Sequence, residues 1–171
     1  HELYTLSIAV MIGVRTSIES TNQVLRASPH RWVGPADFAA VEKYEMRPKG
    51  GLTPPHRLAH TFKFKDYAPM AFAYLRRMYG VNDFDFLMSV CGKANFIEFI
   101  SNAKSGQFFF YSNDGKYMVK TMTNAESKFL RRSKSAPATV VWSRRLSSHL
   151  CLSLLFSSLF LSGLPEYFRH C

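Results

Sequence analysis

Apolar residues near the start of the chain recur at helical spacing. Leu6, Val10 and Val14 lie four positions apart, so they share one face of an α-helix. This pattern predicts a buried helix over residues 3–19. Residues 20–35 are rich in Ser, Thr, Asn, Pro and Gly, and this composition predicts a loop.

The next part of the chain is predicted to form a strand, a connector and a second helix. Residues 38–46 alternate in part between apolar and polar positions, which is typical of a strand. Residues 47–55 contain three prolines and two glycines and predict a connector. Apolar residues then repeat at intervals of three and four between Asp66, the predicted N-cap, and Gly80, the predicted stop.

Three further elements are predicted before the tail. Residues 83–90 form a short helix. Residues 107–112 and 117–122 are aromatic and β-prone, and Asn-Asp-Gly at 113–115 supplies a tight hairpin turn between them. Residues 124–132 read as another helix. The pattern as a whole indicates an α+β fold, in which helices pack on one face of an antiparallel sheet that contains the hairpin.

Charge and cysteine usage narrow the class of protein. A net charge of +10 favours an anionic partner, either nucleic acid or an acidic membrane surface, or else a solvated basic face. Cys91, Cys151 and Cys171 show no metal-ligand spacing and no disulfide framework, which favours a reducing compartment. The chain begins at His1, lacks the pattern of a secretory signal, and is expected to be a fragment.

The tail differs from the rest of the chain. Residues 133–148 are rich in Ser and Arg, whereas residues 150–164 carry no Lys, Arg, Asp or Glu. The apolar run is shorter than the ~20 residues that a membrane-spanning helix needs. It is open to three interpretations: a membrane-associated segment, a buried helix, or aberrant sequence. We favour the last, and expect residues 133–171 to be a disordered or loosely helical tail.

One constellation of residues is suited to nucleotide chemistry. Gly106 lies in a short turn next to a predicted strand, and a small residue there lets backbone N–H groups approach phosphates. Lys120 lies in the second strand of the hairpin, where kinases hold a cation for the α- and β-phosphates. On these residues alone, a surface hairpin with a solvated lysine is the favoured interpretation.

Three stretches of the chain, in the same order, resemble the phosphatidylinositol phosphate kinase family. The first contains FKFKDY followed by PM, F and LR, the second reads DFLMSVCG, and the third is the Gly-containing hairpin. They lie at residues 53–81, 85–92 and 105–121. The opening helix is similar to the first helix of that family. The resemblance covers residues 2–132 and implies that residues 1–132 are a kinase-like N-lobe, an incomplete kinase domain.

The resemblance implies roles for six residues. Lys120 corresponds to the lysine that contacts the phosphates of ATP. Glu126 is the first acid after it, and is either its ion-pair partner or an exposed helix carboxylate. The residues that correspond to the loop over the phosphates are Ser105, Gly106, Gln107 and Phe108.

The resemblance also implies an activity, which this chain alone is not expected to have. The family uses ATP and Mg²⁺ to phosphorylate a phosphatidylinositol monophosphate, most similarly the 4-phosphate to the 4,5-bisphosphate, at the cytoplasmic face of the plasma membrane. No Asp follows Asp114, so we expect neither catalytic residues nor metal ligands in this chain. Candidates for a basic face toward the phosphoinositide lipid are Lys63, Lys65, Arg76 and Arg77.

Two other functions remain open at this point. A non-catalytic scaffold is one, because the resemblance implies a homodimer through the N-terminal helix and its adjoining sheet. A nucleic-acid module is the other, because residues 108–111 are four consecutive aromatics. Consecutive strand residues alternate between faces, so at most two of them could form one stacking platform. We therefore expect no nucleic-acid partner.

Overall fold

The computed structural model describes residues 2–92, 98–102, 107–112, 114–120, 122–133 and 160–162. They form an α+β fold with antiparallel strands, as predicted. In chain order the elements are α1 (Glu2–Ala27), α2 (Pro35–Ala39), β1 (Val41–Met46), β2 (Phe62–Tyr67), α3 (Pro69–Met78), α4 (Asp83–Cys91), β3 (Glu98–Asn102), β4 (Gln107–Tyr111), β5 (Met118–Lys120), α5 (Asn124–Ser133) and β6 (Phe160–Ser162).

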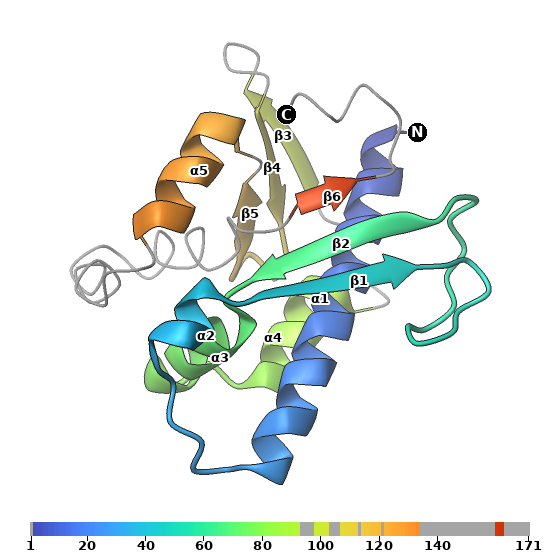
Figure 1. The fold of residues 1–171 in the computed structure, drawn as a ribbon. Coiled ribbons are helices and arrows are strands. Elements are labelled where there is room, and N and C mark those ends of the chain that lie inside the picture. Colours follow the sequence, from blue (N-terminus) through green and yellow to red (C-terminus); the bar gives the residue numbers. More distant parts are fainter. Residues whose placement is uncertain are drawn as a thin grey trace.

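The strands form two three-stranded sheets. Sheet A has the order β1-β2-β6, and sheet B has the order β3-β4-β5 (Figure 1). The long helix α1 runs along sheet A and contacts β1, β2, α3 and α4 (Figure 1). The helices α1, α3 and α4 thus form one layer and sheet A another, as predicted, but the hairpin that was predicted to lie in this sheet belongs to sheet B.

Helix α1 is longer than the sequence pattern suggested. The predicted loop over residues 20–35 is wrong for its first part, because α1 continues to Ala27. Ile18, Thr21 and Leu25 continue the buried stripe of the helix. Burial of these side chains outweighs the weak helix propensity of the intervening Ser, Thr and Asn residues.

The main core lies where α1 crosses sheet A. Val10 and Val14 pack with Phe62 and Phe64, and the two phenylalanines are almost fully buried. Gly13 lies directly over the Phe64 ring, since an added Cβ at that position would be 2.0 Å from Cδ2 of Phe64. The absence of a side chain at Gly13 therefore permits the close approach of α1 to β2.

Residues 62–67 form a strand, which corrects the prediction that Asp66 caps a helix. In β2 the buried Phe62 and Phe64 alternate with the exposed Lys63, which is strand periodicity. Asp66 instead accepts a hydrogen bond from Ser17 Oγ of α1. Helix α3 begins at Pro69, after Ala68 turns the chain with a φ of 59°.

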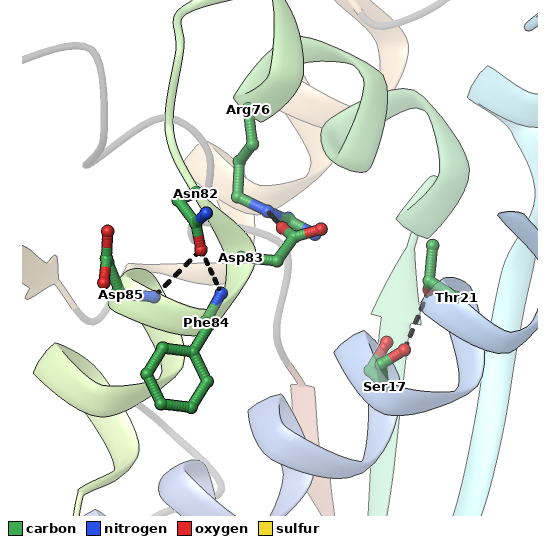
Figure 2. Close-up of polar contacts among 7 residues, drawn as sticks. All are labelled: Ser17, Thr21, Arg76, Asn82, Asp83, Phe84 and Asp85. Carbon is green, nitrogen blue, oxygen red and sulfur yellow. Dashed lines mark hydrogen bonds and ion pairs between the residues drawn. The ribbon is translucent and has the colours of Figure 1, made fainter. Parts of the chain in front are cut away.

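The junction between α3 and α4 is held by a cap and a buried ion pair (Figure 2). The N-cap of α4 is Asn82, whose Oδ1 accepts hydrogen bonds from the backbone N–H groups of Phe84 and Asp85 at 2.8 and 3.3 Å. Arg76 Nε lies 2.8 Å from Asp83 Oδ1, and both side chains are largely buried. Removing one member would leave the other charge uncompensated.

The predicted hairpin and the helix after it are confirmed. β4 and β5 are antiparallel, with Tyr111 paired to Met118, and Gly115 in the turn has a φ of 67°. Helix α5 begins at Asn124, as the pattern indicated. A strand that the sequence analysis did not predict, β3, pairs with the other edge of β4.

The predicted domain division at residue 132 stays a prediction. Of the tail from residue 134 onward, the structure describes only β6, which pairs antiparallel with β2 and places Leu161 opposite Phe64. Among the described residues, no helix has both the length and the apolar composition needed to cross a bilayer.

Candidate functional site

The candidate phosphate-binding loop connects two neighbouring strands of sheet B. Asn102 at the end of β3 is paired with Gln107 at the start of β4, and Ser101 is paired with Phe108. The connection between these paired positions consists of residues 103–106. Its members Ser105 and Gly106 lie outside the described residues.

Lys120 ends the strand on the other side of β4. It is paired with Phe109, which lies two residues beyond Gln107. Strand geometry of about 3.4 Å per residue and about 4.8 Å between strands puts the Cα atoms of Lys120 and Gln107 roughly 8 Å apart. The backbone thus places Lys120 near Gln107, which is one of the residues of the predicted loop. The side chain of Lys120 is outside the described part, so its contact with that loop stays a prediction.

The turn between β4 and β5 is tied to α4 through Asp114. Its Oδ1 accepts hydrogen bonds from Ser89 Oγ at 2.6 Å, from Ser112 Oγ at 2.7 Å and from the backbone N–H of Lys116 at 3.2 Å. Lys116 Nζ lies 3.3 Å from its Oδ2. Desolvation raises the pKa of Asp114, but these donors outweigh it and hold the pKa well below its ordinary value. The carboxylate is therefore charged at neutral pH and fixes the turn.

Apolar contacts anchor the same hairpin to the core. Val119 of β5 is buried with Phe86 and Val90 of α4. The Tyr117 ring meets the Phe86 ring edge-on, with centroids 4.9 Å apart. Burial is the main cause of a raised pKa at Tyr117, so its hydroxyl stays neutral. The strand that carries Lys120 is thus held against α4 by both polar and apolar contacts.

Glu126 makes the hydrogen bonds of a capping box at the start of α5. Its Oε2 accepts from the backbone N–H and from Oγ1 of Thr123 at 2.8 and 3.1 Å, and its own N–H donates to Thr123 Oγ1 at 3.2 Å. These contacts fix the beginning of the helix. The sequence Thr-Asn-Ala-Glu carries the signature of such a box, which the sequence analysis missed. The predicted pairing of Glu126 with Lys120 stays a prediction.

The candidates for a basic face differ in exposure. Arg76 is buried in its ion pair with Asp83, and its guanidinium lies 5.5 Å from the centroid of the Phe86 ring. The prediction that Arg76 faces a lipid surface is therefore wrong. Lys63 and Arg77 are exposed, and Lys65 is half-buried.

The described residues contain no group of three or more His, Cys, Asp or Glu side chains able to hold a metal ion. Burial raises the pKa of the Cys91 thiol to about 12, so this thiol stays protonated and is a poor metal ligand.

Comparison with known proteins points to one family. Residues 90–136, which span sheet B and α5, match the family model described as Phosphatidylinositol-4-phosphate 5-Kinase. The chain is 37% identical over 135 residues to phosphatidylinositol 4-phosphate 5-kinase 9 of Arabidopsis thaliana, covering 77% of this chain and 16% of that protein.

Relatives from a yeast and from human give the same picture. Identity is 36% over 132 residues to the kinase its3 of Schizosaccharomyces pombe, and 36% over 129 residues to the human type-1 alpha enzyme. These alignments cover 77% and 75% of this chain but 17% and 23% of the relatives. The chain therefore spans less than a quarter of the length of these relatives.

Proposed function

The chain belongs to the phosphatidylinositol phosphate kinase family, and on that premise we propose that it is part of a lipid kinase. The proposed reaction is transfer of the γ-phosphoryl group of ATP to the inositol ring of phosphatidylinositol 4-phosphate, which yields the 4,5-bisphosphate. The support is that its relatives from plant, yeast and human carry the name phosphatidylinositol 4-phosphate 5-kinase.

Within that enzyme, sheet B is proposed to hold the phosphates of ATP. The observation that carries this proposal is the register of sheet B, in which the start of β4 lies next to the end of β5. Ser105, Gly106, Gln107 and Phe108 would place backbone N–H groups over the phosphates, since a small, glycine-containing turn permits close approach. Lys120 would supply the cation beneath them.

The capping box at Glu126 fixes the start of α5, which closely follows the strand that carries Lys120. Only three residues separate Lys120 from the start of α5, so fixing the first turn of that helix also restricts the end of β5. We propose that Glu126 positions the segment that carries Lys120, and that its carboxylate forms an ion pair with the lysine ammonium. A carboxylate near a strand lysine holds it charged and oriented toward phosphate.

This chain is proposed to be inactive alone. Phosphoryl transfer needs carboxylates that hold Mg²⁺ and a group that orients the acceptor hydroxyl. The acids that follow Lys120 in the sequence are Glu126 and Glu166. In this proposal the remaining catalytic groups come from the larger part of the enzyme, and this segment contributes the ATP-phosphate lobe.

The proposed place of action is the cytoplasmic face of the plasma membrane, where the lipid substrate lies. Exposed Lys63 on β2 supports attraction to an anionic surface, which contributes about 1 kcal/mol per basic residue. Co-sedimentation of the chain with anionic vesicles measures this attraction. Failure to co-sediment at low salt would contradict the proposal that this chain is attracted to an anionic membrane.

A scaffold role is the second candidate, and one observation favours it. β1 is an edge strand of sheet A, with β2 as its hydrogen-bonded neighbour among the described strands. A free edge is able to pair with a second copy, which would form a homodimer beside α1. A concentration-independent monomer in sedimentation analysis would exclude it.

The lysine test separates a nucleotide site from a simple surface hairpin. A fluorescent ATP analogue is titrated into the chain and into Lys120→Met, with Lys43→Met, an exposed lysine of β1, as the matched control. Loss of a phosphate-binding cation is expected to weaken binding at least about tenfold, whereas the control stays within about twofold.

The test has a clear negative outcome. Equal weakening in Lys120→Met and Lys43→Met would mean that the analogue responds to general positive charge. Unchanged binding in Lys120→Met would exclude sheet B as the phosphate site.

A further inference from the structure

Two clefts meet at Arg77, away from sheet B. The larger, of about 700 Å³, lies between the C-terminal half of α1 and the start of α4. The smaller, of about 390 Å³, lies between the end of α1, the loop at residues 29–33 and α3. Arg77 lines both. Among the described residues that line them, none belongs to β3, β4 or β5, so the two clefts are separate from the proposed ATP site.

The two acids that line the larger cleft are paired with arginines outside its lining, so the arginines of the cleft supply unpaired positive charge. Glu19 is held by Arg15 at 2.8 Å, and Asp83 is held by the buried Arg76 at 2.8 Å (Figure 2). Arg26 and Arg77 face the same cleft from α1 and α3. Within the described part of the chain, neither of these two guanidinium groups forms an ion pair.

The smaller cleft is lined mainly by apolar and aromatic side chains. Trp32 is 78% exposed, Met78 is 64% exposed and Tyr74 is 48% exposed, although each could bury a large apolar area. Leu25 also lines this cleft and is buried. Clustered exposed aromatics and methionine beside arginine are the composition of a protein-binding surface.

We propose that the two clefts form one docking groove for an acidic peptide segment of a partner protein, in which a hydrophobic residue of the peptide enters the smaller cleft. The acidic residues of the peptide would meet Arg77 and Arg26, which complements the unpaired positive charge. The concave shape favours a peptide over a bilayer, because a recess encloses an inserted side chain whereas a planar surface contacts protruding ones.

The proposal is tested with short synthetic peptides and the complete 171-residue chain. The probe is a fluorescein-labelled peptide in which acidic residues flank a Leu-Phe pair. One matched peptide carries Lys in place of each acid, and another carries Ser in place of the Leu-Phe pair. Fluorescence polarisation gives the affinity, and circular dichroism confirms that every protein variant is folded.

Two variants separate the charge from the apolar contact. Arg77→Glu and Trp32→Ala are each expected to weaken binding of the acidic Leu-Phe peptide at least about tenfold. Arg57→Glu, an exposed arginine in the connector between β1 and β2, makes the same charge change outside both clefts. It is expected to change binding by no more than about twofold.

Three results would overturn the proposal. The first is equal binding of the basic peptide or of the peptide without the Leu-Phe pair. The second is no peptide binding, together with binding to phosphatidylserine vesicles that Arg77→Glu abolishes, which would assign the groove to a membrane. The third is a dimer that Arg77→Glu dissociates, which would assign it to a second copy of this chain.

Discussion

Sheet A and sheet B are fixed to the rest of the molecule by different chemistry. Sheet A is held mainly by burial of apolar side chains, with Phe62 and Phe64 packed under α1, together with the hydrogen bond from Ser17 of α1 to Asp66 of β2. The hairpin of sheet B adds a polar network to its apolar contacts, centred on Asp114 and reaching Ser89 of α4. Apolar packing is insensitive to pH, whereas a charged network is not. Sheet A is therefore the structural framework, whereas sheet B carries the candidate site.

The largest expected effect comes from the framework. Phe64→Ala removes a fully buried ring from the contact between α1 and β2 and is expected to lower the free energy of unfolding by about 3–5 kcal/mol. Denaturant unfolding followed by circular dichroism measures it. Phe129→Ala, at a ring that is 69% exposed on α5, is the control and should cost less than about 1 kcal/mol. Similar losses in both variants would contradict the assignment of the core.

A smaller, local effect is expected from the polar network. Ser89→Ala removes the hydrogen bond that joins α4 to Asp114, and because this carboxylate is partly exposed the expected cost is only about 1 kcal/mol. Hydrogen exchange of residues 111–120 should increase, whereas exchange in α1 stays unchanged. Ser28→Ala, at an exposed serine after α1, is the matched control. Faster exchange throughout the chain would show that the network is part of the global framework.

The same network predicts an acid sensitivity with a defined sign. The pKa of Asp114 is lower in the folded chain than in the unfolded chain, so the network stabilises the hairpin above about pH 4. That contribution is lost as the pH falls below about 4 toward the lower folded-state pKa. Asp114→Asn should remove this part of the pH dependence and lower the stability at neutral pH. In this variant, the protection of residues 111–120 from hydrogen exchange should therefore vary less with pH.

The sequence predicts local elements in this molecule better than it predicts their pairing. The hairpin at residues 107–122 and the start of α5 follow from local turn and helix signals, and both are confirmed. Phe62 and Phe64 are buried and alternate with the exposed Lys63, but the prediction followed the helical pattern that comes after them. As a result, β2 was missed. The length of α1 depends on burial of Leu25, which composition alone does not reveal.

The candidate site shows the same limit. Motif similarity pointed to the connection before β4 and to Lys120, and the strand register places the start of β4 beside Lys120. The Ser89–Asp114 hydrogen bond joins residues that are far apart in the sequence, so no local pattern could predict it. Arg76 reads as a surface charge in the sequence, but the fold buries it against Asp83 and Phe86.

The most direct test of the account compares hydrogen exchange of the two sheets with and without saturating ATP. If sheet B holds the phosphates, ATP should slow exchange in residues 98–120 and leave β1 and β2 unchanged. Slower exchange confined to sheet A or to α1, or no change anywhere under conditions where ATP binding is measured independently, would contradict the assignment of the nucleotide site to sheet B.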